Sequence, residues 1–305
     1  MTTTALATIQ PVTSIQPIVA MVCDAVTSEH TRRAYSRALT EFVTWFQSSG
    51  QGVLSKTAVN AHVAALRAAG VSASSINQRL TAIRKLASEA ADNGLIDYAT
   101  AQAIAKAEGV RAEGKRLGNW LSRQDAQRLL DAPSEATNKG IRDRAILAVL
   151  LGCGLRREEC AGLTVEHIQQ REGRWVVVDL VGKRNKMRSV PMPSWARVAV
   201  DEWCKVAGIT SGAVFLSIRR GGNVQGDGMT SQAIRDVVAE YSKVIGLTVA
   251  PHDLRRSFAK LAHKGGAPID QIQLSLGHSS IQTTERYLGV DQNLHSAPCD
   301  VLGLR

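Results

Sequence analysis

LGHSSIQTTERYLGV, at residues 276–290, joins a glycine and a histidine to a tyrosine that follows the histidine by nine residues. A tyrosine hydroxyl is a weak nucleophile near neutral pH, because its ordinary pKa is about 10. Tyr287 would therefore need a neighbouring base or several cations before it could attack an electrophile. Most tyrosines are half-buried packing residues, so this stretch alone leaves both roles open for Tyr287.

Two motifs that carry arginines precede this stretch. HDLRR places His252 and Arg255 three residues apart, so on a helix both side chains lie on one face and can donate to one phosphate. GLRREE places Arg156 after a glycine-bounded turn at a helix start, where backbone N–H groups and a guanidinium would both face an anion. Taken singly, the motifs are more often a structural histidine and an arginine that pairs locally with Glu159.

A basic segment lies between these two motifs. Residues 182–188 read GKRNKMR, and four of the six residues 183–188 are basic. RWVVVDL before this segment and prolines after it predict two strands joined by a turn. The tip of such a hairpin could reach into a DNA groove or deliver a proton to a leaving oxygen, or it could be an ordinary soluble turn.

The rest of the chain predicts two mainly helical regions. Residues 1–20 contain much Thr, Gln and Pro and suggest a loosely ordered leader. Residues 21–108 predict a small all-helical domain, and residues 109–119 have the polar composition of a linker. A second domain, at residues 120–305, starts with a capping-box-like pair, Ser122 and Asp125. The predicted fold class is mainly α with a small β-hairpin or sheet (α+β).

Apolar periodicity and capping signals locate the individual elements. Strands are expected at 174–180 and 186–192. Helices are expected from Ser28 through Phe46 and at 57–69, 74–93, 98–106, 140–151, 156–163, 195–207, 230–245, 254–263, 269–276 and 283–288.

Composition limits the class of protein. The chain has 305 residues, a formal net charge of +10 and 44% hydrophobic residues. Its basic surplus favours a polyanionic partner, chiefly nucleic acid or an anionic membrane surface. Five scattered cysteines without a C-x-x-C pair argue against a disulfide framework and a zinc site, and they fit a cytoplasmic protein. Neither a membrane-spanning apolar run nor a secretory signal is present in the sequence.

Taken together, the motifs resemble the tyrosine recombinases, also called the phage integrase family. The resemblance runs from about Ile18 to Val290 and is strongest in GLRREECAGL, GKRNKMRSVPM, HDLRRSFA and LGHSSIQTTERYLGV. It implies a helical core-binding (SAM-like) domain and a catalytic domain. It also implies a site-specific recombinase that cuts and rejoins DNA by transesterification, through a 3′-phosphotyrosine intermediate and a four-way junction.

The resemblance assigns roles to individual residues. Two arginines would clamp the scissile phosphate, a hairpin lysine would protonate the leaving oxygen, two histidines would complete the site, and an acidic residue would support the first arginine. The nucleophile would be Tyr287. The two arginines would be Arg156 and Arg255, the lysine Lys183, the two histidines His252 and His278, and the acidic residue Glu159. The clustered positive charge would favour the phenolate.

DNA contacts are expected from basic residues of the helical region and of the hairpin. For those on the helices, an ordinary solvated helix face is the competing interpretation. The residues are Arg32, Arg33, Arg79, Arg84, Lys85, Arg184, Lys186 and Arg188.

The expected partner is a double-stranded recombination site, bound by a homotetramer on two DNA sites in the cytoplasm, with the nucleoid. No cofactor or metal is expected, because the sequence has no G-x-x-x-x-G-K-[ST] loop and no clustered carboxylates for Mg²⁺. The alternatives are a type IB topoisomerase with the same chemistry and a catalytically silent DNA-binding protein of the same fold. A metal-dependent nuclease fits less well.

Overall fold

A computed structural model describes residues 15–111, 119–181, 187–219, 221–226 and 228–289. Contacts between Cα atoms divide the chain into two compact units, Met1–Lys115 and Arg116–Arg305. Each unit is described by itself. Residues 1–14 of the expected leader and 112–118 of the expected linker lie outside the described residues.

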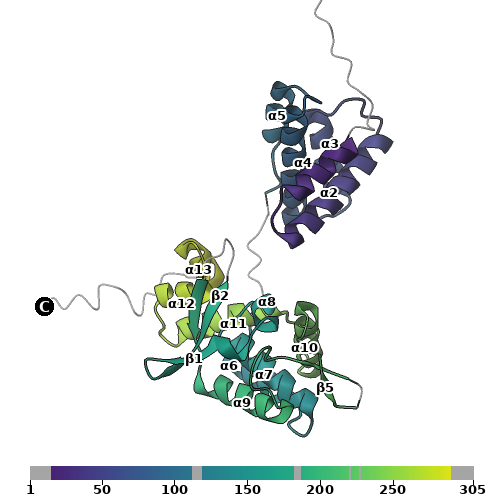
Figure 1. Ribbon diagram of the computed structural model, residues 1–305. Helices are drawn as coiled ribbons and strands as arrows, with labels where there is room; N and C mark the ends of the chain where they lie inside the picture. The colour runs from purple at the N-terminus through teal and green to yellow at the C-terminus, as the bar shows by residue number, and fades with distance from the viewer. Residues whose placement is uncertain (1–14, 112–118, 182–186, 220, 227, 290–305) are drawn as a thin grey trace, which may run out of the picture. The chain divides into compact units, whose positions relative to one another are not determined.

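Unit 1 consists of helices packed around one apolar core (Figure 1). Ser28, Ser55, Ser72 and Asp97 each begin a helix, because the side-chain oxygen of each accepts the backbone N–H three residues later. The helices are α1 (Ile15–Asp24), α2 (Glu29–Ser48), α3 (Lys56–Ala68), α4 (Ala73–Asp92) and α5 (Tyr98–Ala105).

Helix α1 corrects the expected leader. It begins at Ile15, although residues 1–20 are expected to be loosely ordered. Ile18 and Val22, one helical turn apart, are buried, and α1 contacts α2 and α4. Burial of this apolar stripe outweighs the Thr, Gln and Pro content that suggested a leader.

Helix α4 also holds the start of the expected linker. The Val110 N–H donates to Asn77 Oδ1 at 2.8 Å, and Asn77 Nδ2 donates to the Val110 carbonyl at 2.9 Å. A Cβ on Gly109 would lie 2.6 Å from Asn77 Oδ1, so only glycine allows this approach without a shift. Residues 109 and 110 therefore belong structurally to unit 1.

Unit 2 is larger and mainly helical, with two small antiparallel sheets. Its core lies around α7, which contacts α6, α8, α9, α10 and α11. The helices are α6 (Arg123–Asp131), α7 (Asn138–Gly152), α8 (Arg157–Ala161), α9 (Ser194–Ala207), α10 (Ser231–Val244), α11 (Pro251–Lys264), α12 (Ile269–Leu276) and α13 (Ile281–Leu288).

The larger sheet contains the expected strand pair and one further strand. β2 (Arg174–Val181) lies between β1 (Ile168–Arg171) and β3 (Met187–Pro191). The register of β2 against β3 shifts between Val177 and Leu180, where Asp179 has a positive φ of 56°. This bulge locally increases the twist of β2 just before residues 182–186. Two-residue strands β4 (Ser217–Ile218) and β5 (Val224–Gln225) form the second sheet.

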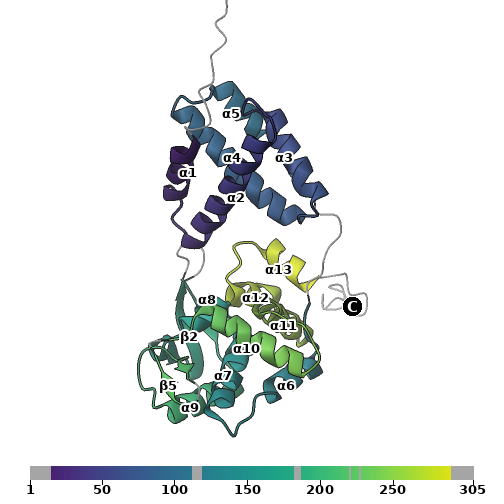
Figure 2. The ribbon, with the colours of Figure 1, turned by 90° about the vertical axis from the view of Figure 1, so that its right-hand side faces the viewer.

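Helices α11, α12 and α13 lie together in unit 2 (Figure 2). Ala259, Ile272, Leu276 and Leu288 form a small separate core between them. Buried apolar contacts therefore hold the stretch 276–289 against the helix that carries HDLRR.

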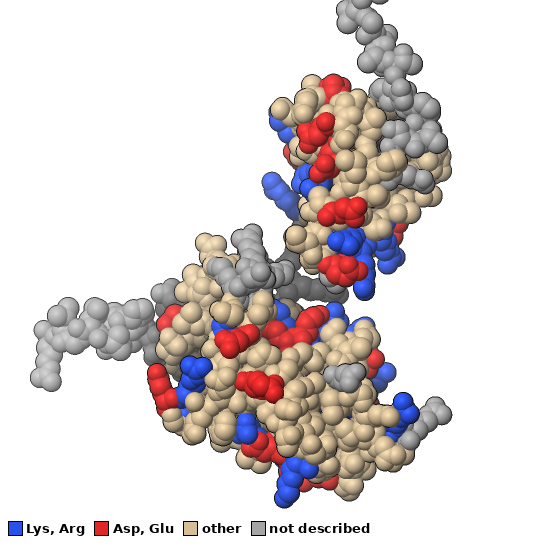
Figure 3. Space-filling model, in the orientation of Figure 1, with Lys and Arg blue, Asp and Glu red and all other residues tan. Residues whose placement is uncertain are grey.

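The surface carries both signs of charge. Lys and Arg lie among Asp and Glu on the visible face of each unit (Figure 3). In the described parts of the chain, none of the helices is both long enough and apolar enough to cross a membrane.

Candidate active site

Tyr287 lies between two histidines and an arginine. Its hydroxyl forms a hydrogen bond with Nε2 of His252. The rings of His252 and His278 meet the Tyr287 ring edge-on, with centroids 5.3 Å and 4.9 Å away. The guanidinium carbon of Arg256 lies 5.0 Å from the centroid of the same ring. The phenol oxygen therefore has a base within hydrogen-bonding reach and a cation nearby.

Helix α11 carries two of these groups, His252 and Arg256, together with Arg255. Pro251 starts the helix with a suitable fixed φ, and Asp253 Oδ2 accepts the Ala250 N–H at 3.0 Å. His252 faces Tyr287 and keeps part of its surface open to solvent, whereas Arg255 is only 2% exposed. The buried guanidinium donates to the carbonyl of Gly154, at 2.5 Å, and to the carbonyl of Leu276. Arg255 thus joins α11 to the turn before α8 and to the end of α12.

Arg156 reaches the same place from the start of α8. It is the N-cap residue, and its side chain is 30% exposed. Its Nη2 donates to the Leu276 carbonyl at 3.4 Å, the carbonyl that also binds Arg255. Two guanidiniums from distant parts of the sequence therefore converge on one backbone oxygen.

Glu159 holds Arg156 in place. Its carboxylate accepts the Arg156 backbone N–H at 2.7 Å and Arg156 Nη1 at 2.6 Å. Burial alone would raise the pKa of Glu159, but hydrogen bonds and charge from Arg188 and Arg156 lower it to about 2. Glu159 is therefore ionised at neutral pH, as a support for the first arginine requires.

Arg188, one of the expected DNA contacts, is engaged within unit 2. Its side chain is 9% exposed, and its two Nη atoms each donate a hydrogen bond to the Glu159 carboxylate at 2.8 Å. Its Nε donates to the Ser275 carbonyl at 2.9 Å. These bonds join β3 to α8 and α12 through the guanidinium of Arg188.

Two glycines make this convergence possible. Gly277 has a φ of +61°, and a Cβ there would lie 2.8 Å from Arg188 Cδ. Gly154 has a φ of +59°, and a Cβ there would lie 2.6 Å from the ring of Phe258. Both positions therefore require a left-handed backbone and a close approach, which only glycine combines without strain.

His278 follows Gly277 directly and is positioned by α13. Its Nδ1 lies 3.0 Å from the hydroxyl of Thr284, which is fully buried. This contact leaves Nε2 as the atom free to face a substrate. Burial, followed by the charges of Arg255 and Arg156, lowers the pKa of His278 to about 4. His278 is thus neutral at physiological pH.

The pKa shifts at Tyr287 and His252 correct the expected phenolate. Burial raises the pKa of the Tyr287 hydroxyl, and the charges of Arg255, Arg256 and Arg156 oppose that rise without reversing it. Burial and the charges of Arg256 and Arg255 lower the pKa of His252. Tyr287 is therefore a neutral phenol next to a neutral imidazole that can accept its proton.

The other expected residues lie elsewhere. Lys183, Arg184 and Lys186 are outside the described residues. On unit 1, Arg32 and Arg33 pair with Glu29 on exposed turns of α2. The other three basic residues expected to contact DNA lie on α4. Arg79 pairs with Glu41, Lys85 pairs with Glu89, and Arg84 donates to the Ala107 carbonyl.

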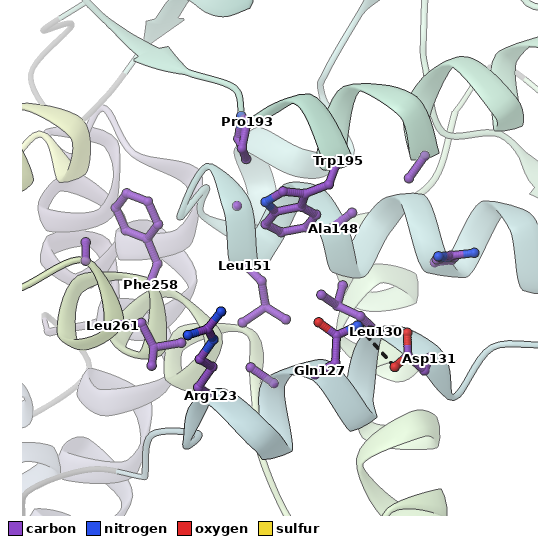
Figure 4. Close-up of a pocket in the computed structure, with 15 residues that line it drawn as sticks. Arg123, Gln127, Leu130, Asp131, Ala148, Leu151, Pro193, Trp195, Phe258 and Leu261 are labelled. Atoms are coloured by element: carbon purple, nitrogen blue, oxygen red, sulfur yellow. Dashed lines mark hydrogen bonds between the residues drawn. The ribbon is translucent and has the colours of Figure 1, made fainter. Parts of the chain in front are cut away.

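A pocket of about 560 Å³ lies apart from this cluster (Figure 4). Side chains of α6, α7, α9 and α11 line it, among them Leu130, Leu151, Trp195, Phe258 and Leu261. His252, Arg255, Arg256, His278 and Tyr287 are not among the lining residues, so the converging polar groups and the pocket are separate features of unit 2.

Comparisons with known protein families agree with this division of the chain. Residues 119–293 match the phage integrase family, and residues 22–94 match the phage integrase N-terminal SAM-like domain. The chain is 31% identical to tyrosine recombinase XerD of Pseudomonas aeruginosa, across 88% of this chain and 91% of the relative. It is 30% identical to XerC of Thermodesulfovibrio yellowstonii, across 87% of each.

Solved structures share the fold at lower sequence identity. The XerH recombinase in a post-cleavage complex with a palindromic difH substrate aligns with a TM-score of 0.74 and 16% identity, covering 96% of this chain and 97% of that one. A lambda integrase dimer bound to a COC′ core site aligns with a TM-score of 0.69 and 15% identity, covering 92% and 96%. These structures confirm the fold class, a mainly helical chain with small antiparallel sheets.

Proposed function

This chain belongs to the phage integrase family of tyrosine recombinases and is a site-specific DNA recombinase of the Xer type, and we propose that Tyr287 is the residue that attacks the DNA backbone. The observation that carries this assignment is the hydrogen bond between the Tyr287 hydroxyl and His252, beside the guanidiniums of Arg156 and Arg255. The family findings do not favour the topoisomerase or the silent DNA-binding protein.

The two guanidiniums bind the scissile phosphate. Arg156 and Arg255 share the Leu276 carbonyl and so lie close enough together to act on one anion. Donors fixed in advance neutralise the charge that builds on the non-bridging oxygens as phosphorus becomes five-coordinate. Glu159 and Arg188 act through Arg156 and are positioning residues.

His252 removes the phenol proton as the bond forms. The Tyr287 oxygen attacks phosphorus, its proton moves to His252 Nε2, and the bond to the 5′ oxygen breaks. His278, neutral and held by Thr284, donates a hydrogen bond to the phosphate. The product is a 3′-phosphotyrosyl link, which conserves the energy of the phosphodiester for rejoining.

The leaving 5′ oxygen needs a proton, and we assign its transfer to Lys183. In the sequence, this lysine follows β2 and precedes β3, two strands of the sheet that also supplies Arg188. When the strand is rejoined, the 5′ hydroxyl returns the proton and displaces Tyr287.

The partner is a double-stranded DNA recombination site. Family relatives act on such sites, and the basic surplus of this chain suits a polyanion. We further propose a homotetramer on two sites that passes through a four-way junction, acting in the cytoplasm with the nucleoid. Arg32, Arg33, Arg79, Arg84 and Lys85 of unit 1 would contribute DNA contacts, as would Arg184 and Lys186.

Strand exchange in vitro tests this function. Two supercoiled plasmids that carry the recombination site from the flanks of the gene are incubated with the protein in EDTA. We expect recombinant plasmids with the wild-type chain and none with Tyr287→Phe, which keeps the ring but not the oxygen. Relaxation of the plasmids without exchange would instead indicate a topoisomerase, and exchange by Tyr287→Phe would refute the assignment of the nucleophile.

A further inference from the structure

Two lysines of α11 lie over one half-buried tryptophan, Trp120. The Nζ atoms of Lys260 and Lys264 are 4.7 Å and 4.6 Å from the centroid of the Trp120 ring. Two ammonium groups on one indole repel each other, and each gains only a modest cation–π attraction near water. The arrangement therefore concentrates positive charge rather than neutralising it.

Backbone and side-chain contacts fix Trp120 in this position. The N–H of the next residue, Leu121, donates to Ser257 Oγ at 2.7 Å, and Asn119 Nδ2 donates to the Thr248 carbonyl at 3.3 Å. Ser257 is itself fully buried and donates to the Asp253 carbonyl at 2.8 Å. The indole is thus a platform attached to α11.

The two lysines continue a row that begins at the proposed catalytic centre. Arg256, Lys260 and Lys264 follow one another at four-residue spacing and so share one face of α11, about 6 Å apart along the axis. Arg256 lies over the Tyr287 ring, whereas the lysines lie over Trp120. In the part of the chain that the structure describes, Arg256 pairs with Asp253 and neither lysine pairs with a carboxylate.

We propose that Lys260 and Lys264, held over Trp120, bind backbone phosphates of the DNA beyond the phosphate that Tyr287 attacks. This inference rests on the proposed function, because it takes Tyr287 as the nucleophile and follows the row of basic residues away from it along α11. Phosphate is the favoured ligand because a lysine ammonium is a compact point charge that carries no geometry for reading a base. The attraction of both ammonium groups to the indole limits the lysine rotamers before DNA arrives, which reduces the entropy lost on binding.

The salt dependence of DNA binding tests the proposal. Affinity for a short fluorescent duplex is measured by anisotropy over a range of salt concentrations. Each phosphate contact contributes about 0.9 to the slope of log K against log salt, so the double variant Lys260→Gln/Lys264→Gln should lower the slope by about 1.8. Phosphate contacts carry no sequence information, so affinity should fall equally for different duplexes.

Two further variants make the measurement decisive. Lys205→Gln/Lys243→Gln removes the same charge from exposed last-turn lysines of α9 and α10 and should leave the slope unchanged. Lys260→Arg/Lys264→Arg keeps both charges and should keep the slope. An unchanged slope in the Lys260→Gln/Lys264→Gln variant would overturn the proposal, as would an equal fall in the Lys205/Lys243 control. The same loss in the arginine pair would also overturn it, because packing and not charge would then be responsible.

Covalent adduct formation separates this inference from the proposed function. On a nicked suicide duplex at saturating DNA and low salt, Lys260→Gln/Lys264→Gln should form as much adduct as the wild type. Absence of adduct in the wild type would contradict the proposed function while leaving the slope comparison intact. Absence of adduct only in the variant would mean that the lysines act in the chemical step, and the phosphate-binding proposal would be wrong.

Discussion

The proton shared by Tyr287 and His252 is the central feature at the scale of single residues. Burial keeps this phenol protonated and this imidazole neutral. We expect His252→Ala to slow covalent adduct formation by about 10²–10⁴, the usual contribution of a positioned general base. Single-turnover kinetics on a suicide substrate measures this rate, and Tyr287→Phe gives the zero level.

The pH dependence of the same reaction follows from the directions of the two shifts. Because the His252 pKa is lowered, wild-type rates should stay level from neutral pH to below the ordinary histidine pKa of about 6.5, and then fall. The deficit of His252→Ala should narrow as the pH rises toward the raised pKa of Tyr287, since hydroxide then supplies the phenolate. A deficit that stays constant with pH would rule out a base role for His252.

Glu159 offers a second test at this scale. Its carboxylate is buried between two guanidiniums, so Glu159→Gln leaves buried positive charge unpaired and should lower the free energy of unfolding by about 3–5 kcal/mol. The neighbouring Glu158 is 60% exposed and pairs with Arg157, so Glu158→Gln should cost at most about 1 kcal/mol. Urea denaturation of both variants measures the difference, and equal costs would contradict the support role.

Low pH should destabilise the wild type in the same way as Glu159→Gln does, because it neutralises the same carboxylate. Its folded-state pKa of about 2 lies below its ordinary value of 4.5, so its stabilisation is complete above 4.5 and disappears as the pH falls toward 2. The unfolding free energies of the wild type and Glu159→Gln should therefore converge across this window. If the difference in unfolding free energy persisted as the pH approaches 2, the charge of Glu159 would not be the cause of that difference.

At the scale of elements, local signals predicted most of the helices. Ser28 and Ser122 act as N-caps as expected, and the predicted helix 269–276 has the bounds of α12. Elements that lack a local signal could not be predicted from the sequence. β1 has the polar sequence IQQR and exists only because β2 pairs with it, while β4 and β5 have two residues each.

In the candidate site, too, residues in sequence motifs could be predicted, and contacts that depend on the folded chain could not. The resemblance located the histidines, the arginines and Tyr287, because those residues occur in motifs. It did not predict the pairing of Arg188 with Glu159, because the sequence of a basic hairpin does not reveal which carboxylate lies behind it. Thr284 and Lys260 were missed because their roles depend on contacts with His278 and Trp120, which only the folded chain brings about.

Gly277 provides a prediction that belongs to the end of an element. It ends α12 in the left-handed conformation, and Gly208 ends α9 in the same way, with φ of 61° and 66°. A Cβ on Gly208 meets nothing within 4 Å, whereas one on Gly277 would meet Arg188. Gly208→Ala should therefore cost only the backbone strain of about 1–2 kcal/mol, and Gly277→Ala should cost more. Thermal unfolding measures both, and equal losses would mean that the contact with Arg188 is unimportant.

At the scale of the whole molecule, the two units have separate cores. The fragment 116–305 should therefore fold cooperatively alone and still form the covalent adduct at high DNA concentration. Its salt slope for DNA binding should be smaller than that of the full chain, by about 0.9 for each phosphate contact that unit 1 makes. Circular dichroism and anisotropy measure these properties, and a fragment that binds as steeply as the full chain would place all DNA contacts on unit 2.

Mass spectrometry of the covalent adduct tests most directly whether Tyr287 is the anchor for the broken strand. The chain has four tyrosines, and trypsin cleavage after Arg286 releases residues 287–305, a peptide in which Tyr287 is the only tyrosine. We expect the nucleotide remnant of a nicked suicide duplex on this peptide, attached through its 3′ phosphate. A remnant on a peptide with Tyr35, Tyr98 or Tyr241, or attached through a 5′ phosphate, would contradict the mechanism.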